Sequence, residues 1–328
     1  MSLTELKKRI FNGKNPKFVY YISAYARLCT PLPLLRPRLD RLDSEVDARP
    51  DSDYIRQRAD YYCKAVSYPD VDPRQWREAS VELCRQPMTR QKVYYLDSMW
   101  LARYFDPHLR WHLESGDVNY VPAVPSIAKS RPIGGDNSRA VLLKLDRVRH
   151  FIFADDHKAW RDKADRVIFR GKVKDKEPRL EFLRRWAASP RVDAGSVDRV
   201  PTPWTRPKLT IAEHLDYRYI MAIEGNDVAS NLKWVMSSNS IAVMPKPTCE
   251  TWFMEGRLKP NYHYIEVKPD FSDLMERLDY YSAHPDEAEA IIRHAHEWVS
   301  QFRDSRREKL IQLLVMRKYL AGVGQIGR

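Results

Sequence analysis

The sequence predicts an α/β protein of two domains, and three observations support this. Residues 217–267 contain an apolar run, a polar turn, a helix-like stretch and two further apolar runs. That order is half of a nucleotide-binding α/β unit, which places ligands at the carboxyl ends of its strands. A second strand-like word, residues 166–169, opens another α/β series upstream. The 328 residues also suffice for two domains, each with its own core.

In the first half of the chain, the expected elements are short. Four prolines in residues 30–51 predict an extended loop. Residues 52–66 and 97–104 are patterned as helices. Strands are expected at residues 92–96 (KVYYL), 119–124, 141–145 and 151–154.

The second half has the clearer α/β pattern. Strands are expected at residues 166–169, 191–195, 219–223, 240–244 and 262–267, and helices at 178–188 and 228–237. Residues 286–302 carry apolar side chains at three- and four-residue spacing, which predicts a helix with one face on the core. A last helix, about 305–321, is expected to return toward the N-terminal domain.

These elements suggest four segments. We expect a basic arm and loop at 1–50, an N-terminal domain at 51–160, a C-terminal α/β domain at 161–304, and a C-terminal helix at 305–328 that packs back on the N-terminal domain. Residues 155–164 are expected to cross between the two domains.

The chain carries a large positive net charge, which suggests that it binds an anionic partner. The net charge is +12, and residues 1–40 hold eight Lys or Arg against two acidic residues, which gives +6. Aromatic side chains interleave with these cations at Phe11, Phe18, Tyr20, Tyr21 and Tyr25. This composition suits an anionic membrane surface. A solvated arm without a partner is the alternative, and nucleic acid is less favoured because no nucleic-acid motif is present.

Other features narrow the class. No segment is long and apolar enough to span a bilayer, and no secretory signal is seen. Four scattered cysteines indicate reduced thiols in a cytoplasmic protein. The absence of G-x-G-x-x-G and G-x-x-x-x-G-K-[ST] argues against an NAD-dependent enzyme or a P-loop enzyme. D-x-D pairs at Asp51/Asp53 and Asp70/Asp72 lie in Pro-rich loops, so we expect turns there and no metal site.

A series of different short motifs follows in order along the chain. They are IRQRADYY (55–62), GDV (116–118), PSIAKSRP (125–132), RHF (149–151), FRG (169–171), EGNDVASNLKW (224–234), SNS (238–240), E-x-WF (250–253) and LKP-x-x-HY (258–264). Over about residues 50–320 this order resembles glycosyltransferase family 90, and it looks closest to the bacterial lipopolysaccharide A-type members. That family also contains capsule transferases and animal protein O-glucosyltransferases.

The resemblance implies a GT-B architecture, in which two Rossmann-like domains face a central cleft. Residues 51–160 would then be the acceptor-side domain, and residues 161–304 the nucleotide-sugar-binding domain. It also implies an inverting, metal-independent transfer from a UDP-sugar, with no cofactor, to a lipopolysaccharide-core or capsule glycan. The enzyme would then be cytoplasmic or peripheral on the inner face of the cytoplasmic membrane. The alternative is a basic α/β protein that binds nucleic acid or an anionic membrane without catalysis.

A sugar transferase needs a base for the acceptor hydroxyl and positive charge or N–H groups for the departing diphosphate. Asp117 is the candidate base, because its place before PSIAK is similar to that of the catalytic aspartate in the O-glucosyltransferase relatives. The alternative role for Asp117 is to cap a turn after Gly116. Glu224 and Asp227 are the next candidates, although Asp227 also suits a helix N-cap.

The donor-binding candidates follow the same resemblance. Arg170 and Arg179 supply guanidinium donors, Gly171 allows close backbone approach, and the turn from Gly225 to Ser230 offers N–H groups. The remaining candidates are Asn231 as an amide, Lys233 for phosphate charge, and Glu250 for sugar or ribose hydroxyls. Lys129 and Arg131 are expected either to reach the cleft from the other domain or to be solvated loop residues.

Overall fold

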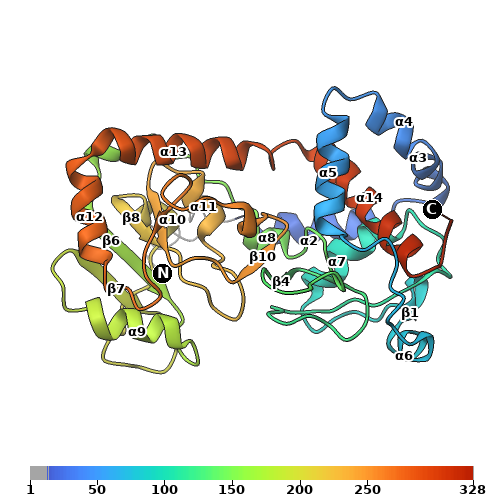
Figure 1. Cartoon of the computed structure of the whole chain (residues 1–328), viewed down its shortest axis with the longest axis horizontal. Helices are drawn as coiled ribbons and strands as arrows, with labels where there is room; N and C mark the ends of the chain where they lie inside the picture. Colours follow the sequence, from blue (N-terminus) through green and yellow to red (C-terminus); the bar gives the residue numbers. More distant parts are fainter. Residues whose placement is uncertain (1–12, 14, 328) are drawn as a thin grey trace. The chain divides into compact units, whose positions relative to one another are not determined.

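The computed structural model describes residue 13 and residues 15–327, which form two compact units (Figure 1). We call the first the sheet unit; its described residues are Gly13, Asn15, 149–247 and 255–301. We call the second the helical unit; its described residues are 16–148, 248–254 and 302–327. The chain is therefore a mixed α/β protein, which confirms the predicted class.

The sheet unit is built around five parallel strands in the order β11-β9-β8-β6-β7. They are β6 (Ala164–Gly171), β7 (Val192–Ser196), β8 (Tyr217–Met221), β9 (Ile241–Met244) and β11 (Ile265–Glu266). Every residue of β9 is buried, as are Ile220 and Tyr219 of β8 on opposite faces of the sheet. Burial on both faces is typical of a parallel sheet covered by helices, and explains the continuous apolar runs in the sequence.

Helices complete this unit. They are α9 (Glu177–Trp186), α10 (Ile211–His214), α11 (Leu232–Met236), α12 (Leu274–Ala283) and α13 (Pro285–Ser300), with 3₁₀ turns η3 (Trp160–Asp162) and η4 (Glu255–Arg257). Helix α13 packs against α11, α12 and β9. Phe182 of α9 lies edge-on to both Phe169 of β6 and Phe271, with ring centroids 5.5 and 5.3 Å away. Apolar burial thus holds the helices to the sheet.

The helical unit has no comparable sheet among its described residues. Its helices are α2 (Lys17–Leu28), α3 (Arg36–Asp40), α4 (Leu42–Asp47), α5 (Ser52–Tyr62), α6 (Pro73–Ala79), α7 (Lys92–Ala102) and α14 (Ser305–Gly322), with η1 (Leu32–Leu34) and η2 (Leu83–Arg85). Helix α8 (Arg147–His150) begins in this unit and ends in the sheet unit. Helix α14 packs against α4, α5 and α7, and α2 packs against α7.

Its strands form three pairs. β1 (Val81–Glu82) is antiparallel to β2 (Arg110–Trp111), and β3 (Ser126–Ala128) is parallel to β5 (Ala140–Leu142). The third pair joins β4 (Ser130–Pro132) to β10 (Cys249–Thr251), with Arg131 directly opposite Glu250. Segments more than a hundred residues apart in sequence are therefore joined in this unit.

Buried charges connect these segments. Glu308 of α14 accepts from Arg58 of α5 at 2.5 Å, from Lys144 at 2.9 Å, and from the indole N–H of Trp252 at 2.6 Å. The carboxylate is 3% exposed. Burial raises the pKa of Glu308, but the positive charges of Lys144 and Arg58 lower it by more. The pKa therefore lies below its usual value, and the carboxylate stays ionised. The cluster stabilises only when complete, because a buried charge without its partner is costly.

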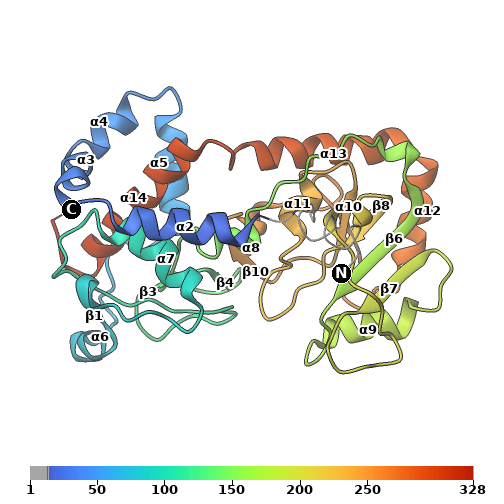
Figure 2. The same ribbon diagram turned by 180° about the vertical axis from the view of Figure 1, so that it is seen from behind.

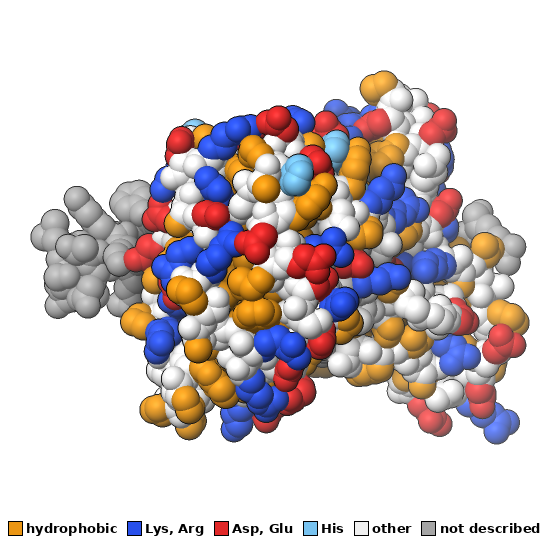
Figure 3. All heavy atoms as spheres, turned by 60° about the vertical axis from the view of Figure 1, so that its left-hand side comes forward, with side chains coloured by type: hydrophobic (Ala, Val, Ile, Leu, Met, Phe, Trp, Pro, Cys, Tyr) orange, Lys and Arg blue, Asp and Glu red, His pale blue; other side chains and the backbone are white. Residues whose placement is uncertain are grey.

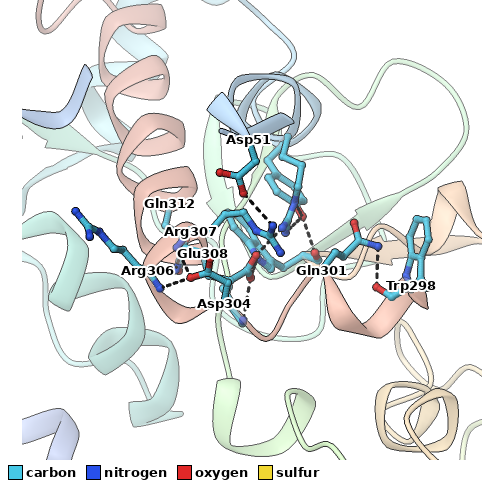
Figure 4. Close-up of polar contacts among 12 residues, drawn as sticks. Asp51, Trp298, Gln301, Asp304, Arg306, Arg307, Glu308 and Gln312 are labelled. Carbon is cyan, nitrogen blue, oxygen red and sulfur yellow. Dashed lines mark hydrogen bonds and ion pairs between the residues drawn. The ribbon is translucent and has the colours of Figure 1, made fainter. Parts of the chain in front are cut away.

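The backbone N–H groups at the start of α14 are capped by a neighbouring side chain (Figure 4). Asp304 is the N-cap, and its Oδ1 accepts the backbone N–H groups of Arg306 and Arg307, each at 3.0 Å. Arg307 in turn donates to Asp51 Oδ2 at 3.0 Å. The first turn of this helix is therefore satisfied within the protein.

The strands predicted at 166–169, 191–195, 219–223, 240–244 and 262–267 are confirmed, as are the helices at 178–188, 286–302 and 305–321. In the predicted 228–237 helix, only Leu232–Met236 is helical, because residues 224–230 form the polar turn. Strand β10 was not expected at all.

Four predictions for the first half were wrong. Residues 30–51 are not an extended loop but hold η1, α3 and α4, because two of the prolines lie in the first turn of a helix, where proline is tolerated. Residues 92–96 are the start of α7 rather than a strand. Residues 119–124 and 151–154 contain no strand, although the strand expected near 141–145 is present as β5.

The tertiary reason for the α7 error is burial. Val93, Tyr94 and Tyr95 favour a strand locally, yet α7 is enclosed on most sides, with Tyr94, Leu96 and Leu101 buried. Such a helix lacks the polar face that would identify it in the sequence.

Candidate active site

At the carboxyl end of the parallel sheet, Arg179 lies under the turn that follows β8. Its Nε donates to the carbonyls of Ile223 and Glu224 at 3.2 and 3.0 Å, and its Nη1 donates to Lys172 O at 2.9 Å. Among the described residues it forms no ion pair. Burial lowers the pKa of Arg179, although Asp198 and Asp227 raise it, and a guanidinium remains charged at neutral pH in either case. This leaves a fixed positive charge at the sheet edge where ligands bind in such folds.

Gly225 is required by this arrangement. A Cβ added at Gly225 would lie 2.9 Å from Arg179 Nη2, closer than real Cβ contacts. The guanidinium is held by its carbonyl bonds, so a larger residue would displace it. The glycine of the EGND motif therefore lets the turn close over the arginine.

Arg170, the other predicted guanidinium, is engaged inside the protein. Its Nη2 pairs with Asp193 at 2.6 Å, its Nη1 donates to two carbonyls, and its Nε donates to Pro207 O at 3.3 Å. Burial raises the pKa of Asp193, but hydrogen bonds from Tyr217 and Arg170 outweigh it and lower the pKa overall. Arg170 thus joins the ends of β6 and β7. Gly171 closes β6 and pairs with Ser196 of β7.

The turn after β8 positions the other predicted groups differently. Ser230 is exposed, Glu224 is half-buried and Asp227 is buried. Asn231 is the residue preceding α11, and its amide donates back to Met221 O at 2.9 Å. The turn is closed by Gly225 N–H donating to Asp227 O at 2.9 Å. Ser230 and Asn226 are thus the exposed residues of this turn, and Asn226 already contacts Lys176.

Two predicted donor ligands are buried in ion pairs. Lys233 is 0% exposed, and its Nζ lies 2.7 Å from Glu255 Oε1 within the sheet unit. Glu250 belongs to the helical unit, where it pairs with Arg131 at 2.8 Å and accepts from Tyr61. A ligand cannot meet either group in this conformation without breaking a buried pair.

Sequence reasoning missed a row of cations beside Arg179. Lys172, Lys174 and Lys176 alternate along the loop between β6 and α9. Lys176 Nζ contacts Asn226 Oδ1 of the turn after β8, which joins the two loops. The KVKDK word directly after FRG was the signal, because lysines at the carboxyl end of a strand surround the expected ligand site.

In the helical unit, Asp117 is held in place by its neighbours. Its Oδ1 accepts from Lys129 Nζ at 2.5 Å and from Tyr94 OH at 3.1 Å, and its side chain is 21% exposed. The ammonium favours the ionised carboxylate. The group therefore combines negative charge with access to solvent, as a proton acceptor requires.

The backbone around Asp117 is fixed from both sides. Gly116 adopts φ +124°, which other L-residues rarely adopt. On the other side, the buried Ser130 hydroxyl donates to Val118 O at 2.7 Å and accepts Val118 N–H at 3.1 Å. Tyr94 and Ser130 were not predicted, because they act through contacts between distant segments.

Lys129 and Arg131 are not solvated loop residues. Both are at most 2% exposed. Lys129 contacts Asp117, whereas Arg131 pairs with Glu250 and donates to the carbonyls of Tyr62, Ala140 and Tyr61 at 3.2, 3.0 and 2.8 Å. Only Lys129 is therefore next to the candidate base.

Metal-type groups gather elsewhere. Glu82, Cys84 and His108 bring one ligand atom each within 4.8 Å of one another. Arg85 Nε already lies 3.3 Å from the same Glu82 oxygen, so the charge of this half-buried carboxylate is met by the protein. Of the D-x-D pairs, Asp51 pairs with Arg49 and Arg307, which lowers its pKa to about 2. Asp72 caps α6 through Arg74 N–H.

Comparison with known proteins bears on these motifs. A family model described as glycosyl transferase family 90 matches residues 141–308. The O-glucosyltransferase LpsA of Dichelobacter nodosus is 40% identical over 286 residues, which cover 87% of this chain and 86% of the relative. The chain belongs to glycosyl transferase family 90.

Weaker similarity extends to eukaryotic and viral proteins. Human protein O-glucosyltransferase 3 is 23% identical over 232 residues, covering 64% of this chain and 45% of the relative. The uncharacterized protein 035R of invertebrate iridescent virus 3 is 24% identical over 176 residues, covering 46% of this chain and 16% of the relative.

As a family 90 glycosyltransferase, the enzyme takes a sugar from a donor and transfers it to an acceptor. No helix in the described part of the chain has the length and apolar character to cross a membrane.

Proposed function

We propose that this family 90 enzyme transfers a sugar from a UDP-sugar to a lipopolysaccharide-core or capsule glycan, with inversion and without a metal ion. Glucose is the first sugar to test, because the Dichelobacter relative is an O-glucosyltransferase by name. The observation that carries the proposal is Asp117: its carboxylate is partly exposed and paired with a lysine, in a chain whose family transfers sugars.

In the proposed reaction, the acceptor hydroxyl oxygen attacks the anomeric carbon from the side opposite the diphosphate. The new C–O bond forms as the bond from that carbon to the UDP β-phosphate oxygen breaks. Asp117 takes the hydroxyl proton, and the bond electrons leave with UDP. Because the transition state at the anomeric carbon is oxocarbenium-like, the main tasks are proton removal and stabilisation of the leaving diphosphate.

The carboxyl end of the parallel sheet is the proposed donor site. Arg179, the lysines 172, 174 and 176, and the exposed Ser230 supply positive charge and polar groups there. Arg170 would shape this site rather than touch the donor, because its charge is met by Asp193. Gly171, Gly225 and Asn231 would do the same through bonds within the protein. Asp227 is buried and would also shape the turn. Glu224 remains a candidate for donor hydroxyls.

The proposal includes a GT-B arrangement, with the sheet unit as the nucleotide-binding domain. Only the sheet unit has an extended parallel sheet among its described residues; the helical unit has strand pairs. A lipid-linked acceptor would place the enzyme in the cytoplasm, peripheral on the inner face of the membrane.

UDP release tests the proposal. The protein is incubated with a soluble core oligosaccharide and, separately, with UDP-glucose, UDP-galactose and UDP-xylose, with and without EDTA. We expect acceptor-dependent UDP release from one of the three, unchanged by EDTA, and a product with the opposite anomeric configuration. Release that requires added Mn²⁺, or retention of configuration, would contradict the proposal.

A further inference from the structure

Helix α2 presents an apolar face to solvent. Phe18 is 75% exposed and Ile22 is 54% exposed, and Tyr25 and Val19 are also on the surface. Residues 18, 22 and 25 follow the spacing of one helix side. The opposite side is attached to α7, where Tyr20 OH donates to the buried Asp97 at 2.9 Å (Figure 2). The helix is thus anchored by one face, and its apolar face is left uncovered by the described residues.

Cations lie at the end of this helix. Arg27, in the last turn of α2, lies 5.1 Å from the ring centroid of Trp100. Lys309 of α14 lies 5.9 Å from the same ring, so Trp100 joins the end of α2 to α14. Neither Arg27 nor Lys309 forms an ion pair with any residue in the described part of the chain. Unpaired positive charge therefore lies at the C-terminal end of α2, in the turn that follows Tyr25.

Lys309 also lines a pocket of about 240 Å³ in the helical unit. Its walls are Arg38, Glu45, Arg306, Lys309, Leu310 and Leu313. Three cations and one carboxylate give the pocket a net charge of +2 by this count. Arg306 lies 3.7 Å from Glu45, whereas Arg38 has no ion-pair partner among residues 15–327. The pocket therefore has cationic capacity for an anion.

The cations of this pocket come from side chains, not from a helix end. Asp304 already accepts the N–H groups of Arg306 and Arg307 at the start of α14 (Figure 4). On the face drawn in Figure 3, Lys and Arg side chains are interspersed with Asp and Glu rather than gathered in a stripe. An apolar helix face beside a cationic pocket fits a lipid bilayer, which offers hydrocarbon and phosphate at adjacent depths.

We propose that α2 and this pocket form a docking surface for an anionic membrane. The face made by Phe18, Val19, Ile22 and Tyr25 enters the headgroup boundary, and the pocket formed by Arg38, Arg306 and Lys309 receives a lipid phosphate. The four cations, including Arg27, select anionic over neutral lipid. This surface is independent of the sugar and acceptor that the enzyme uses.

Sedimentation with vesicles tests the docking surface. The full chain is mixed with vesicles of phosphatidylcholine alone, or of equal parts phosphatidylcholine and phosphatidylglycerol. We expect binding to the anionic vesicles and its loss as NaCl is raised. Arg38→Ala should lower the partition coefficient about fivefold, and Phe18→Ser combined with Ile22→Ser about tenfold.

Matched variants control for charge and for surface apolarity. Arg74→Ala removes an exposed cation elsewhere in the helical unit, and Val200→Ser removes an exposed apolar side chain of the sheet unit. Neither should change vesicle binding, and the exposed positions of Phe18 and Ile22 mean that the melting temperature should be unaffected. Equal binding to both vesicle types, or equal losses in the control variants, would overturn the proposal.

A second copy of the chain is the competing occupant. The mass of the protein without vesicles, measured by light scattering, distinguishes the two. A dimer that Phe18→Ser converts to a monomer would assign the face to self-association and refute the membrane proposal. UDP release with a soluble acceptor should be the same for Phe18→Ser and the parent chain, so failure of docking and failure of sugar transfer are read separately.

Discussion

The two units place their functional groups by different means. In the sheet unit, backbone ladders set the strand ends, and the loops that follow carry Arg179 and three lysines at one edge. In the helical unit, side-chain bonds between distant segments do the placing: Lys129 holds Asp117, and Glu308 joins α14 to α5. Substitutions in loops of the sheet unit should therefore change binding, whereas substitutions of buried charges in the helical unit should change stability.

The largest expected effect concerns Asp117. Asp117→Asn keeps the size of the side chain but removes its basicity, so turnover should fall by about 10²–10⁴ with UDP affinity unchanged. Acceptor-dependent UDP release and UDP titration measure the two quantities. Asp136→Asn, an exposed carboxylate of the same unit, is the matched control and should retain activity. Near-normal turnover in Asp117→Asn would transfer the role of base to Glu224 or Asp227.

The second test removes the centre of the buried charge cluster. Glu308→Ala leaves Arg58 and Lys144 buried without their carboxylate, so the free energy of unfolding should fall by about 3–5 kcal/mol. Asp60→Asn breaks only the surface contact with Lys318 and should cost less than about 1 kcal/mol. Urea denaturation followed by tryptophan fluorescence gives both values. Similar values for the two variants would show that the helical unit does not depend on this cluster.

The third test uses pH on the sheet unit. Burial, with smaller effects from His294 and Lys259, lowers the pKa of His263 to about 4, and its Nδ1 accepts Lys259 N–H at 2.9 Å. The unfolded chain binds the proton first, so this contribution is complete above about pH 6.5 and is lost as pH falls toward 4. The loss should approach about 3 kcal/mol.

His263→Gln should reduce the slope of stability against pH between those values, as measured by denaturation at several pH values. His157→Gln, an exposed histidine of the same unit, should leave the slope unchanged. If the two variants titrate alike, the neutral state of His263 is not what stabilises the fold.

The smallest expected effect compares the two arginines of the sheet edge. Arg179→Ala should weaken UDP binding by about 1.5–3 kcal/mol, the scale of hydrogen bonds to a charged group. Arg170→Ala should weaken it less, because the charge of Arg170 is already met by Asp193, whereas Arg179 has no ion-pair partner among the described residues. Calorimetry with UDP in the absence of metal measures both. A greater loss in Arg170→Ala would assign the diphosphate to Arg170 instead.

The same contrast explains what the sequence predicts well. The parallel strands of the sheet unit are continuous apolar runs bounded by turns, so Tyr219–Ile223 and Ser240–Met244 were recognisable without tertiary knowledge. Helix α7 and the proline-containing helices were not, because their residues favour other local structures and tertiary burial decides the outcome.

For the candidate site, the motifs indicated which residues to consider but not what each side chain contacts. The KSRP word gave Lys129 and Arg131 equal standing, yet one contacts Asp117 and the other pairs with Glu250. The spacing of residues along the chain cannot predict these different contacts, because they depend on which distant segment pairs with β4. The lysines of KVKDK, in contrast, were visible and could have been included.

The route of the chain through the helical unit affects the order of folding during synthesis. Residues 16–148 are made before the sheet unit, but β10 follows about a hundred residues later and α14 follows the helices of the sheet unit. The sheet unit has all its strands once residue 266 has been made. Arg58 and Lys144 of the helical unit, in contrast, cannot form their buried ion pairs until Glu308 has been made. The earlier-synthesised unit is therefore completed later, and its apolar helices stay incompletely packed on the ribosome, where chaperones act on such segments.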